Sequence, residues 1–600
     1  MRNLWLKNSR IGGVAIAAAL TLGFASPSHA QSSDYLNYDG LTREIQSIVG
    51  GSNMARVMSV ATTAEGRDVW MVEIGNPNGV PLDQRPALLV VANLSADHLI
   101  GSHLAVESIR RLLAQAATDE DVRRVMTENT IYVVPRANPD GAESFFGSLL
   151  WDRRGNSRPY DDDNDGRTDE DGPNDLNGDG MITVMRVMDP EGDFIVHPDD
   201  ARLMKRASAS DREAGRYTLY WEGTDDDGDG SYNEDGMGGV DLDRNFQHEH
   251  PYYQADAGPH MVSEPETRAL IDFAVAHRNI AAILTFGHSD NLVTAPNGQG
   301  RLAGASMPDL AAFADQPNSG ILSTGVFSSN PDNARGGLQL RGAQPGADND
   351  PNSGRRPQVT VDGQDTPYMA AVTELYRELT GIESVAMNRT AEGAFFQFGY
   401  YQYGVPSFST QGWALPEAEG TNSGTVEQKA LAALGDGVFV PWAPVQHPDF
   451  ESAEVGGFMP GSLANPMGAA ISQANGEAHG DFIAGLAGML PRLSIVDTEV
   501  TAHGGGVFTV SAVIENSGYF PTALRHGVVS RSVDATMVQI QVDAADIITG
   551  GPKTATTATL AGSGNRERFT WVIRGQSGAT VEIRARAQKG GTATTTVTLR

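Results

Sequence analysis

The chain has 600 residues, 40% of them hydrophobic, and a formal net charge of −31. A chain of this length exceeds what one hydrophobic core supports, so the composition predicts at least two folded domains and excludes a disordered protein. The negative charge argues against nucleic acid as a partner, because phosphates are recognised by basic surfaces. The chain contains no cysteine, which excludes disulfides, thiolate metal sites and lipid attachment through cysteine.

The first residues have the three parts of a secretory signal. Basic residues precede an apolar run over residues 11–24, and the segment ends in Ser-His-Ala at residues 28–30, which fits the small residues of a cleavage site. The apolar run is too short to cross a membrane as an ordinary helix. We therefore expect a signal peptide over residues 1–30, a mature chain that begins near Gln31, and export to the periplasm or beyond without a membrane anchor.

Apolar runs typical of buried strands alternate with stretches of helical periodicity in the part of the chain that follows. The predicted strands lie at residues 87–94, 130–135 and 280–287, and the predicted helices at residues 99–116 and 263–277. Strands that alternate with helices are typical of the α/β class. We expect one domain over residues 31–425.

Polar residues with the character of a reactive site occur at several points along this part of the chain. In chain order they are Ser95 and His98, Asn-Pro-Asp-Gly at residues 138–141, Arg154, Asp243 and Arg244 within Gly-Val-Asp-Leu-Asp-Arg-Asn-Phe at residues 239–246, His288, and Gln411 after Gly-Val-Pro at residues 404–406. This order resembles the zinc carboxypeptidase family, called M14, over roughly residues 35 to 420. The resemblance implies a mixed sheet flanked by helices and a zinc-dependent peptidase site.

The resemblance also implies which residues of the zinc site are replaced. In its register Ser95 stands in place of a zinc-binding His and His98 in place of the zinc-binding Glu, while His288 is the retained third ligand. A catalytic zinc site needs three protein ligands and a water, and a neutral hydroxyl is a poor substitute. Gln411 replaces the catalytic Glu, and an amide cannot accept the proton of an attacking water.

The substrate-binding residues implied by the resemblance are altered as well. Arg244 matches the residue that binds the C-terminal carboxylate of the substrate, and Asp243 stands where an Asn normally donates a hydrogen bond. An ionised Asp243 would oppose that carboxylate by roughly 4 kcal/mol at about 4 Å unless it pairs with Arg244. Arg154 matches the Arg that polarises the scissile carbonyl. Arg389, four residues before Gly393, is the nearest counterpart of the Tyr that covers bound substrate.

An acidic insertion occupies about residues 156–238, between two parts of this site. Asp-x-Asn-x-Asp-Gly at residues 175–180 is the pattern in which alternating oxygens converge on calcium. Arg186 stands where an EF-hand has its bidentate Glu, so further ligands must come from neighbouring acidic turns. We expect structural calcium rather than a solvated loop, because such dense carboxylates repel one another without a cation. The expected ligands are Asp161, Asp163, Asp165, Asp169, Asp175, Asn177, Asp179, Asp225, Asp227 and Asp229.

The remaining segments carry no catalytic motif. A polar loop at residues 343–365 precedes a predicted helix at residues 367–379. Residues 426–490 are rich in Gly and Pro and are expected to be a connector with one helix near its end. From residue 491 to residue 600, apolar and polar residues alternate in several short runs, which predicts a β-sandwich.

Three functions are compatible with these observations. The first is an exported, catalytically degenerate carboxypeptidase-like protein that binds peptides or peptidoglycan fragments. The second is an active metallocarboxypeptidase whose rearranged site holds zinc through His98 and His288, helped by Asp97, while another carboxylate supplies the base. The third is a calcium-dependent surface adhesion module. Shared fold does not imply shared chemistry, and the replaced zinc ligands and base favour the first.

A purely structural interpretation exists for the same residues, and we favour it for each of them. In that interpretation His288 is a buried, hydrogen-bonded histidine, Asp243 and Arg244 form an ion pair, and Gln411 is a strand-end amide. The sequence does not identify the ligand or the oligomeric state.

Overall fold

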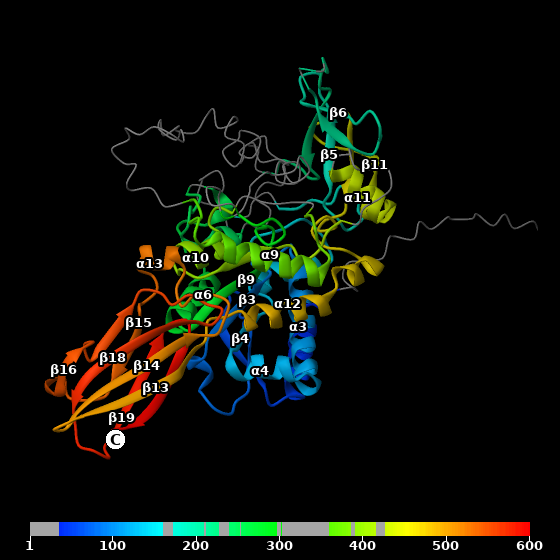
Figure 1. Ribbon diagram of the computed structural model, residues 1–600. Helices are drawn as coiled ribbons and strands as arrows, with labels where there is room; N and C mark the ends of the chain where they lie inside the picture. Colours follow the sequence, from blue (N-terminus) through cyan, green and yellow to red (C-terminus); the bar gives the residue numbers. More distant parts are fainter. Residues whose placement is uncertain are drawn as a thin grey trace, which may run out of the picture.

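The computed structural model describes residues 35–159, 172–208, 212–226, 239–252, 254–296, 359–385, 391–415 and 426–600, together with residues 168, 210 and 302. A central α/β layer carries a small β-sheet at one end and a β-sandwich at the other (Figure 1). The expected signal peptide and Arg389 lie outside the described residues. Among the helices that are described, none is both long enough and apolar enough to cross a bilayer.

The central sheet has six strands in the order β1-β2-β4-β3-β9-β10. Their bounds are Ala55–Thr62 for β1, Asp68–Ile74 for β2, Ala87–Ala92 for β3, Thr130–Val134 for β4, Ile280–Phe286 for β9 and Ser407–Thr410 for β10. Strands β4, β3, β9 and β10 are parallel, whereas β1 and β2 are antiparallel to their neighbours. The parallel strands are buried along their whole length, as their continuous apolar runs predict. The expected mixed sheet is confirmed.

Helices cover both faces of this sheet. Alternate residues of β3 explain why, since Leu88 and Val90 join the core on one face and Leu89 and Val91 the core on the other. The helices on the first face are α2 (Tyr38–Gly50), α3 (Leu99–Thr118), α9 (Thr366–Thr380) and α12 (Gly476–Gly488), and α4 (Glu120–Glu128) packs beside α3. Helix α6 (Pro265–Ala276) lies on the second face, and α10 (Phe395–Tyr401) contributes side chains to both cores.

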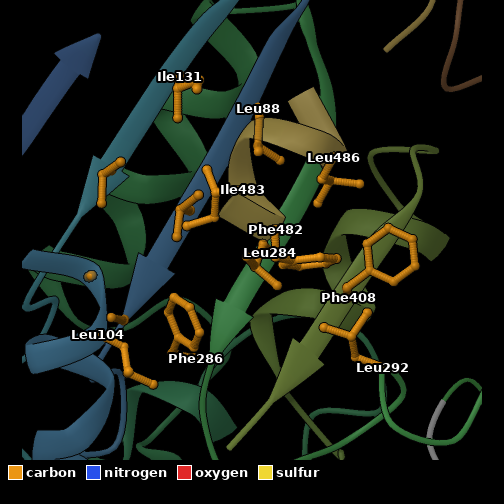
Figure 2. Close-up of a cluster of buried hydrophobic side chains, with 14 of the residues drawn as sticks. Leu88, Leu104, Ile131, Leu284, Phe286, Leu292, Phe408, Phe482, Ile483 and Leu486 are labelled. Atoms are coloured by element: carbon orange, nitrogen blue, oxygen red, sulfur yellow. The ribbon is translucent and has the colours of Figure 1, made fainter. Parts of the chain in front are cut away.

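Residues 426–490, which we expected to be a connector, form part of the folded core. Helix α12 packs against α3 and α9, and Figure 2 shows its Phe482, Ile483 and Leu486 among the buried side chains of the sheet. The helix approaches α3 so closely that a methyl group on Gly480 would lie 2.7 Å from the Arg111 side chain. Its glycines permit this close packing, and the helix expected near the end of the segment lies against the core of the central layer.

The small sheet combines strands from two distant parts of the sequence, in the order β11-β12-β5-β8-β6-β7. The acidic insertion supplies β5 (Val184–Met188), β6 (Phe194–Val196), β7 (Met204–Arg206) and β8 (Tyr217–Trp221), and the later segment supplies β11 (Phe439–Val445) and β12 (Ala453–Phe458), with α11 (Val426–Leu434) before them. An ion pair of 2.7 Å joins Arg186 of β5 to Glu454 of β12. The insertion is therefore completed by residues that follow the central sheet.

The C-terminal segment is strand-rich, with two four-stranded sheets around one core that includes Trp571. One sheet contains β13 (Leu493–Gly504), β14 (Val507–Asn516), β18 (Asn565–Arg574) and β16 (Ile547–Gly550), and the other contains β17 (Thr554–Thr557), β15 (Thr536–Ile540), β19 (Thr580–Ala587) and β20 (Gly591–Thr598). The short helix α13 (Arg525–Val529) docks on the central layer, where the Asp365 carboxylate accepts the Arg525 backbone N–H at 2.7 Å. Lys589 donates to the Arg278 carbonyl at 3.0 Å and lies 3.8 Å from the Tyr403 ring centre.

Candidate functional site at the carboxyl edge of the central sheet

The expected site residues gather where the parallel strands end. Ser95 and His98 follow β3, His288 follows β9 and Gln411 follows β10, and parallel strands bring their carboxyl ends to one edge of a sheet. The rings of His98 and His288 lie edge to face with centres 5.0 Å apart. The Gln411 amide Nε2 donates to the His288 carbonyl at 3.3 Å. All four residues are buried.

The turn after β3 is shaped by Asn93. Its φ of 55° lies in the left-handed region that Asn tolerates better than most residues. Its Nδ2 donates to the carbonyls of Ser95 and Ala96, both at 3.0 Å. The backbone N–H of Ala96 in turn donates to the Arg154 carbonyl at 2.9 Å. This turn therefore fixes Ser95 and His98 and draws the Arg154 segment beside them.

The Ser95 hydroxyl is bound to Asp241. It donates to Oδ1 of Asp241 at 2.7 Å, and the same oxygen accepts the backbone N–H of Asp243 at 3.0 Å. Burial raises the pKa of Asp241 to about 6, although the bond from Ser95 acts in the opposite direction. At neutral pH Asp241 is thus mainly a carboxylate, and the hydroxyl of Ser95 is committed to it.

Asp97 connects His288 with Arg154. Its Oδ1 lies 2.7 Å from Nε2 of His288, and its Oδ2 lies 3.4 Å from Nε of Arg154. The Asp97 backbone is held as well, because its carbonyl accepts Nδ2 of Asn465 at 2.7 Å. From the sequence we expected Asp97 only to assist His98 and His288 in binding zinc. In the structure Asp97 lies between His288 and Arg154 and contacts both.

These side chains do not fit a catalytic zinc. Such a site needs three protein ligands around the metal, and the described part of the chain contains no group of three or more His, Cys, Asp or Glu side chains arranged to hold a metal ion. The hydroxyl at the Ser95 position donates to Asp241. The Nε2 atom of His288 already lies at hydrogen-bonding distance from Asp97.

Asp243 and Arg244 do not pair with each other. Burial, and next the nearby Asp241, raise the pKa of Asp243 to about 8, so this carboxyl is mainly protonated at neutral pH. Its Oδ1 accepts the backbone N–H of Phe395 at 3.0 Å. Arg244 instead forms a 2.9 Å ion pair with Asp256 and a hydrogen bond to Gln254. The expected opposition between an ionised Asp243 and a ligand carboxylate therefore does not arise at neutral pH.

Close backbone packing joins the segment that follows Arg154 to the segment that precedes Arg244. A Cβ atom on Gly239, whose φ is 111°, would lie 2.2 Å from the Asn156 carbonyl oxygen. The Asn156 side chain accepts the Val240 N–H at 3.0 Å and donates to Glu264 at 2.8 Å. Asn156 was not among the expected site residues, although its place beside Arg154 in Arg-Gly-Asn was a usable signal.

The expected calcium loop forms a tight turn. The Asp175 carboxylate accepts the N–H groups of Gly178 at 2.6 Å and Gly180 at 2.7 Å, and Oδ1 of Asn177 accepts the Asp179 N–H at 2.8 Å. The structure thus brings Asp175, Asn177 and Asp179 together, and Asp225 is also described. The other expected ligands lie outside the described residues; they are Asp161, Asp163, Asp165, Asp169, Asp227 and Asp229.

The buried side chain of Glu222 holds the two ends of this turn together. Its carboxylate accepts the backbone N–H groups of Leu176 and Thr183, both at 3.0 Å. Burial raises its pKa to about 7 against the effect of these bonds. Glu222 was not predicted, because a lone Glu at the end of a strand carries no calcium pattern.

Comparison with known proteins finds relatives for two segments of this chain. Residues 44–333 match the family described as zinc carboxypeptidase, Peptidase M14, and residues 492–598 match a domain of unknown function, DUF8731. The chain is 29% identical over 114 residues to a zinc carboxypeptidase of Saccharothrix mutabilis subsp. capreolus, which covers 18% of this chain and 25% of that protein. It is 28% identical over 91 residues to carboxypeptidase D of Homo sapiens, which covers 15% of this chain and 7% of that protein.

The chain therefore matches no more than 25% of the length of either curated relative. Among solved structures, bovine thrombin-activatable fibrinolysis inhibitor in complex with tick carboxypeptidase inhibitor gives a TM-score of 0.31 at 12% identity, over 75% of this chain and 98% of that one. The family match spans Ser95, Arg154, Arg244 and His288. The segment that builds most of this site, residues 44–333, therefore belongs to the zinc carboxypeptidase family, M14.

Proposed function

We propose that this protein is an exported, catalytically degenerate member of the zinc carboxypeptidase family that binds peptide ends or peptidoglycan fragments without cleaving them. The observation that carries the proposal is the 2.7 Å contact between His288 and Asp97. It engages the one retained zinc ligand in a network of protein groups.

The proposal is supported by the loss of the metal-binding donors. Ser95 offers a hydroxyl that donates to Asp241, and a neutral hydroxyl does not replace an imidazole as a zinc ligand. A metal at Nε2 of His288 would have to displace Asp97, and the buried Asp97 carboxylate would lose its 2.7 Å contact with that histidine. Burying a charge with fewer partners is costly.

The proposal is also supported by the lack of a base at the position of the family's catalytic Glu. Gln411 donates its amide to the His288 carbonyl, and an amide has no basic lone pair for a proton from water. Asp243 is held mainly protonated at neutral pH. Asp241 accepts the bonds from Ser95 and Asp243.

Binding is supported by two cations at the edge of this site. The side chains of Arg154 and Arg244 are 22% and 19% exposed, so both remain within reach of solvent. Guanidinium groups suit carboxylates because they present parallel N–H donors. In a chain of net charge −31, these cations favour an anionic ligand at this edge. A peptide C-terminus and the carboxylates of a peptidoglycan stem share that chemistry.

Metal content and hydrolysis, measured together on the purified chain from residue 31 onward, test this proposal. We expect no stoichiometric zinc by mass spectrometry and no release of C-terminal residues from a peptide panel, with or without added zinc. Isothermal titration with the same peptides should show binding that Arg244→Gln weakens. Zinc bound at one equivalent, with chelator-sensitive cleavage that His288→Ala abolishes, would instead establish an active enzyme with a rearranged site.

Structural calcium in the acidic insertion is a second proposal. It is favoured by the turn around Asp175, whose carboxylate is fixed by the N–H groups of Gly178 and Gly180. Calcium should raise the melting temperature relative to a chelator, magnesium should do so less, and Asp175→Ala should remove the difference. If calcium moves neither the melting temperature nor the far-ultraviolet spectrum, the acidic segment is a solvated loop.

A further inference from the structure

Arg244 is engaged by two side chains of its own chain. Its Nε lies 2.9 Å from Oδ2 of Asp256, and its Nη2 donates to Oε1 of Gln254. The Asp256 side chain is 44% exposed, whereas that of Arg244 is 19% exposed. An acidic side chain that reaches in from solvent therefore meets the cation that the proposed function assigns to the ligand carboxylate.

The backbone under Arg244 is fixed independently of this pair. The Arg244 N–H donates to the Asp241 carbonyl at 2.9 Å. Gly393, with φ of 75°, packs so tightly on Arg244 that an added Cβ would lie 2.1 Å from the Arg244 carbonyl oxygen. The Phe246 N–H also donates to the Gly393 carbonyl at 2.8 Å. The guanidinium is thus carried by a rigid turn whether or not Asp256 contacts it.

The backbone of Asp256 is anchored as well, so only its side chain has to move. The Asp256 carbonyl accepts the Asp241 N–H at 2.8 Å. Nδ2 of Asn245 donates to the carbonyls of Ala257 at 2.8 Å and His260 at 3.1 Å. We expect rotation of the half-exposed Asp256 side chain to uncover Arg244 without opening the segment, because surface side chains change rotamer within nanoseconds.

We infer that Asp256, assisted by Gln254, is an internal competitor for the carboxylate that Arg244 binds. The inference rests on the proposed function, because it assigns the ligand's carboxylate to Arg244. An ion pair with one partner so exposed contributes little on its own, so a ligand displaces it readily, yet it lowers the affinity for every carboxylate ligand. Ligands that lack a carboxylate are not affected.

The test compares two forms of one peptide by isothermal titration, one with a free C-terminal carboxylate and one with a C-terminal amide. Asp256→Asn should bind the acid about fivefold more tightly than the parent chain, with the amide unchanged. Asp272→Asn is the matched control, because it removes one exposed acidic charge from α6 and should leave both affinities as they are. Gln254→Ala should act in the same direction as Asp256→Asn.

The outcomes separate the inference from the proposed function. If the parent chain binds the acid through Arg244 and Asp256→Asn binds it equally or more weakly, Asp256 is no competitor and the inference fails alone. If Asp256→Asn tightens the acid and the amide equally, the effect is one of net charge and the inference fails again. If neither chain binds the acid, with melting temperatures unchanged, both the inference and peptide-end binding fail.

Discussion

The hydroxyl of Ser95 and the carboxylate of Asp241 are joined by a hydrogen bond of 2.7 Å that links the end of β3 to the segment that carries Arg244. Asp241 is buried and mainly ionised at neutral pH, since its pKa is about 6. A buried carboxylate requires a donor. Ser95 supplies it, so the replacement of a zinc-binding His leaves this pair satisfied.

Restoring the family's residues should restore a metal site. In the triple variant Ser95→His, His98→Glu and Gln411→Glu, the new imidazole has Asp241 available as a partner that orients it, as carboxylates commonly do for zinc-binding histidines. We expect one equivalent of zinc by mass spectrometry and a higher melting temperature with zinc. Adding His288→Ala to the triple variant should abolish both effects. A triple variant that folds and binds no zinc would show that the site geometry has diverged along with its residues.

Asp243→Asn should change how stability depends on pH. The folded-state pKa of Asp243 is raised to about 8 from a usual value of 3.8, so between these pH values the native state holds a proton that the unfolded chain has released. Stability contributed at this position is therefore greatest at low pH and decreases as pH rises towards 8. The Asn side chain does not titrate, so the free energy of unfolding of the variant should fall less between pH 5 and pH 8. Urea titrations at these two pH values measure the free energy of unfolding.

The control for that experiment is Asp272→Asn, at an exposed position on α6. It should leave the pH dependence of the unfolding free energy as it is in the parent chain. If the pH dependence of the unfolding free energy is the same in Asp243→Asn as in the parent chain, Asp243 is ionised in the native protein. It would then repel a ligand carboxylate at Arg244, as the sequence led us to expect.

Tyr376→Phe should destabilise the protein because it removes a hydroxyl from a buried hydrogen-bond network. The Tyr376 hydroxyl lies 3.1 Å from Oγ1 of Thr410 and 3.1 Å from Nε2 of His479, and thereby joins α9 and α12 to the residue before Gln411. Its loss leaves buried polar atoms without this partner, which costs about 1–3 kcal/mol. Chemical denaturation measures this cost as a change in the free energy of unfolding. Tyr368→Phe on the same helix is the control. An equal decrease in the free energy of unfolding in the two variants would argue against the hydrogen-bond network.

Lys589→Met tests the contact between the sandwich and the central layer. Burial lowers the pKa of Lys589 well below its usual 10.5, so the native state releases a proton that the unfolded chain retains, and stability at this position rises with pH in that window. Methionine preserves the packing on Tyr403 and removes the cost of burying an amine. We expect higher stability at pH 7 and a smaller rise between pH 7 and pH 10. A large loss of stability at pH 7 would mean that the bond to the Arg278 carbonyl dominates.

The sequence was informative where a physical constraint acts locally. Continuous apolar runs located β3 and β9 because strands buried on both faces admit little else. The residues that follow those strands were grouped by the resemblance to the zinc carboxypeptidase family. That resemblance assigns Ser95, His98 and His288 to one site, and the structure brings the rings of His98 and His288 together.

The sequence was uninformative where partners are far apart. Nothing in the sequence around Asp256 indicates that it contacts Arg244, and the pairing of β5 with β12 has no local signature. The sequence indicated a helix near the end of residues 426–490 but not its packing on α3, because its glycines look like flexible residues when only composition is considered. The protonation of Asp243 depends on burial and on Asp241, which a pattern of residue types does not reveal.

Two elements that come late in the sequence, β12 and α12, complete the small sheet and the central layer. This arrangement has a consequence for how the protein folds. Strand β12 pairs with β5, and α12 covers β3 and β9 from a position hundreds of residues later. The small sheet cannot be completed until residue 458 is available, and the central layer cannot be completed until residue 488 is available. Long-range closure of this kind slows folding and leaves apolar strands uncovered in the meantime. A nascent chain therefore presents an incomplete sheet until most of its length has been synthesised, and its folding should depend strongly on chaperones.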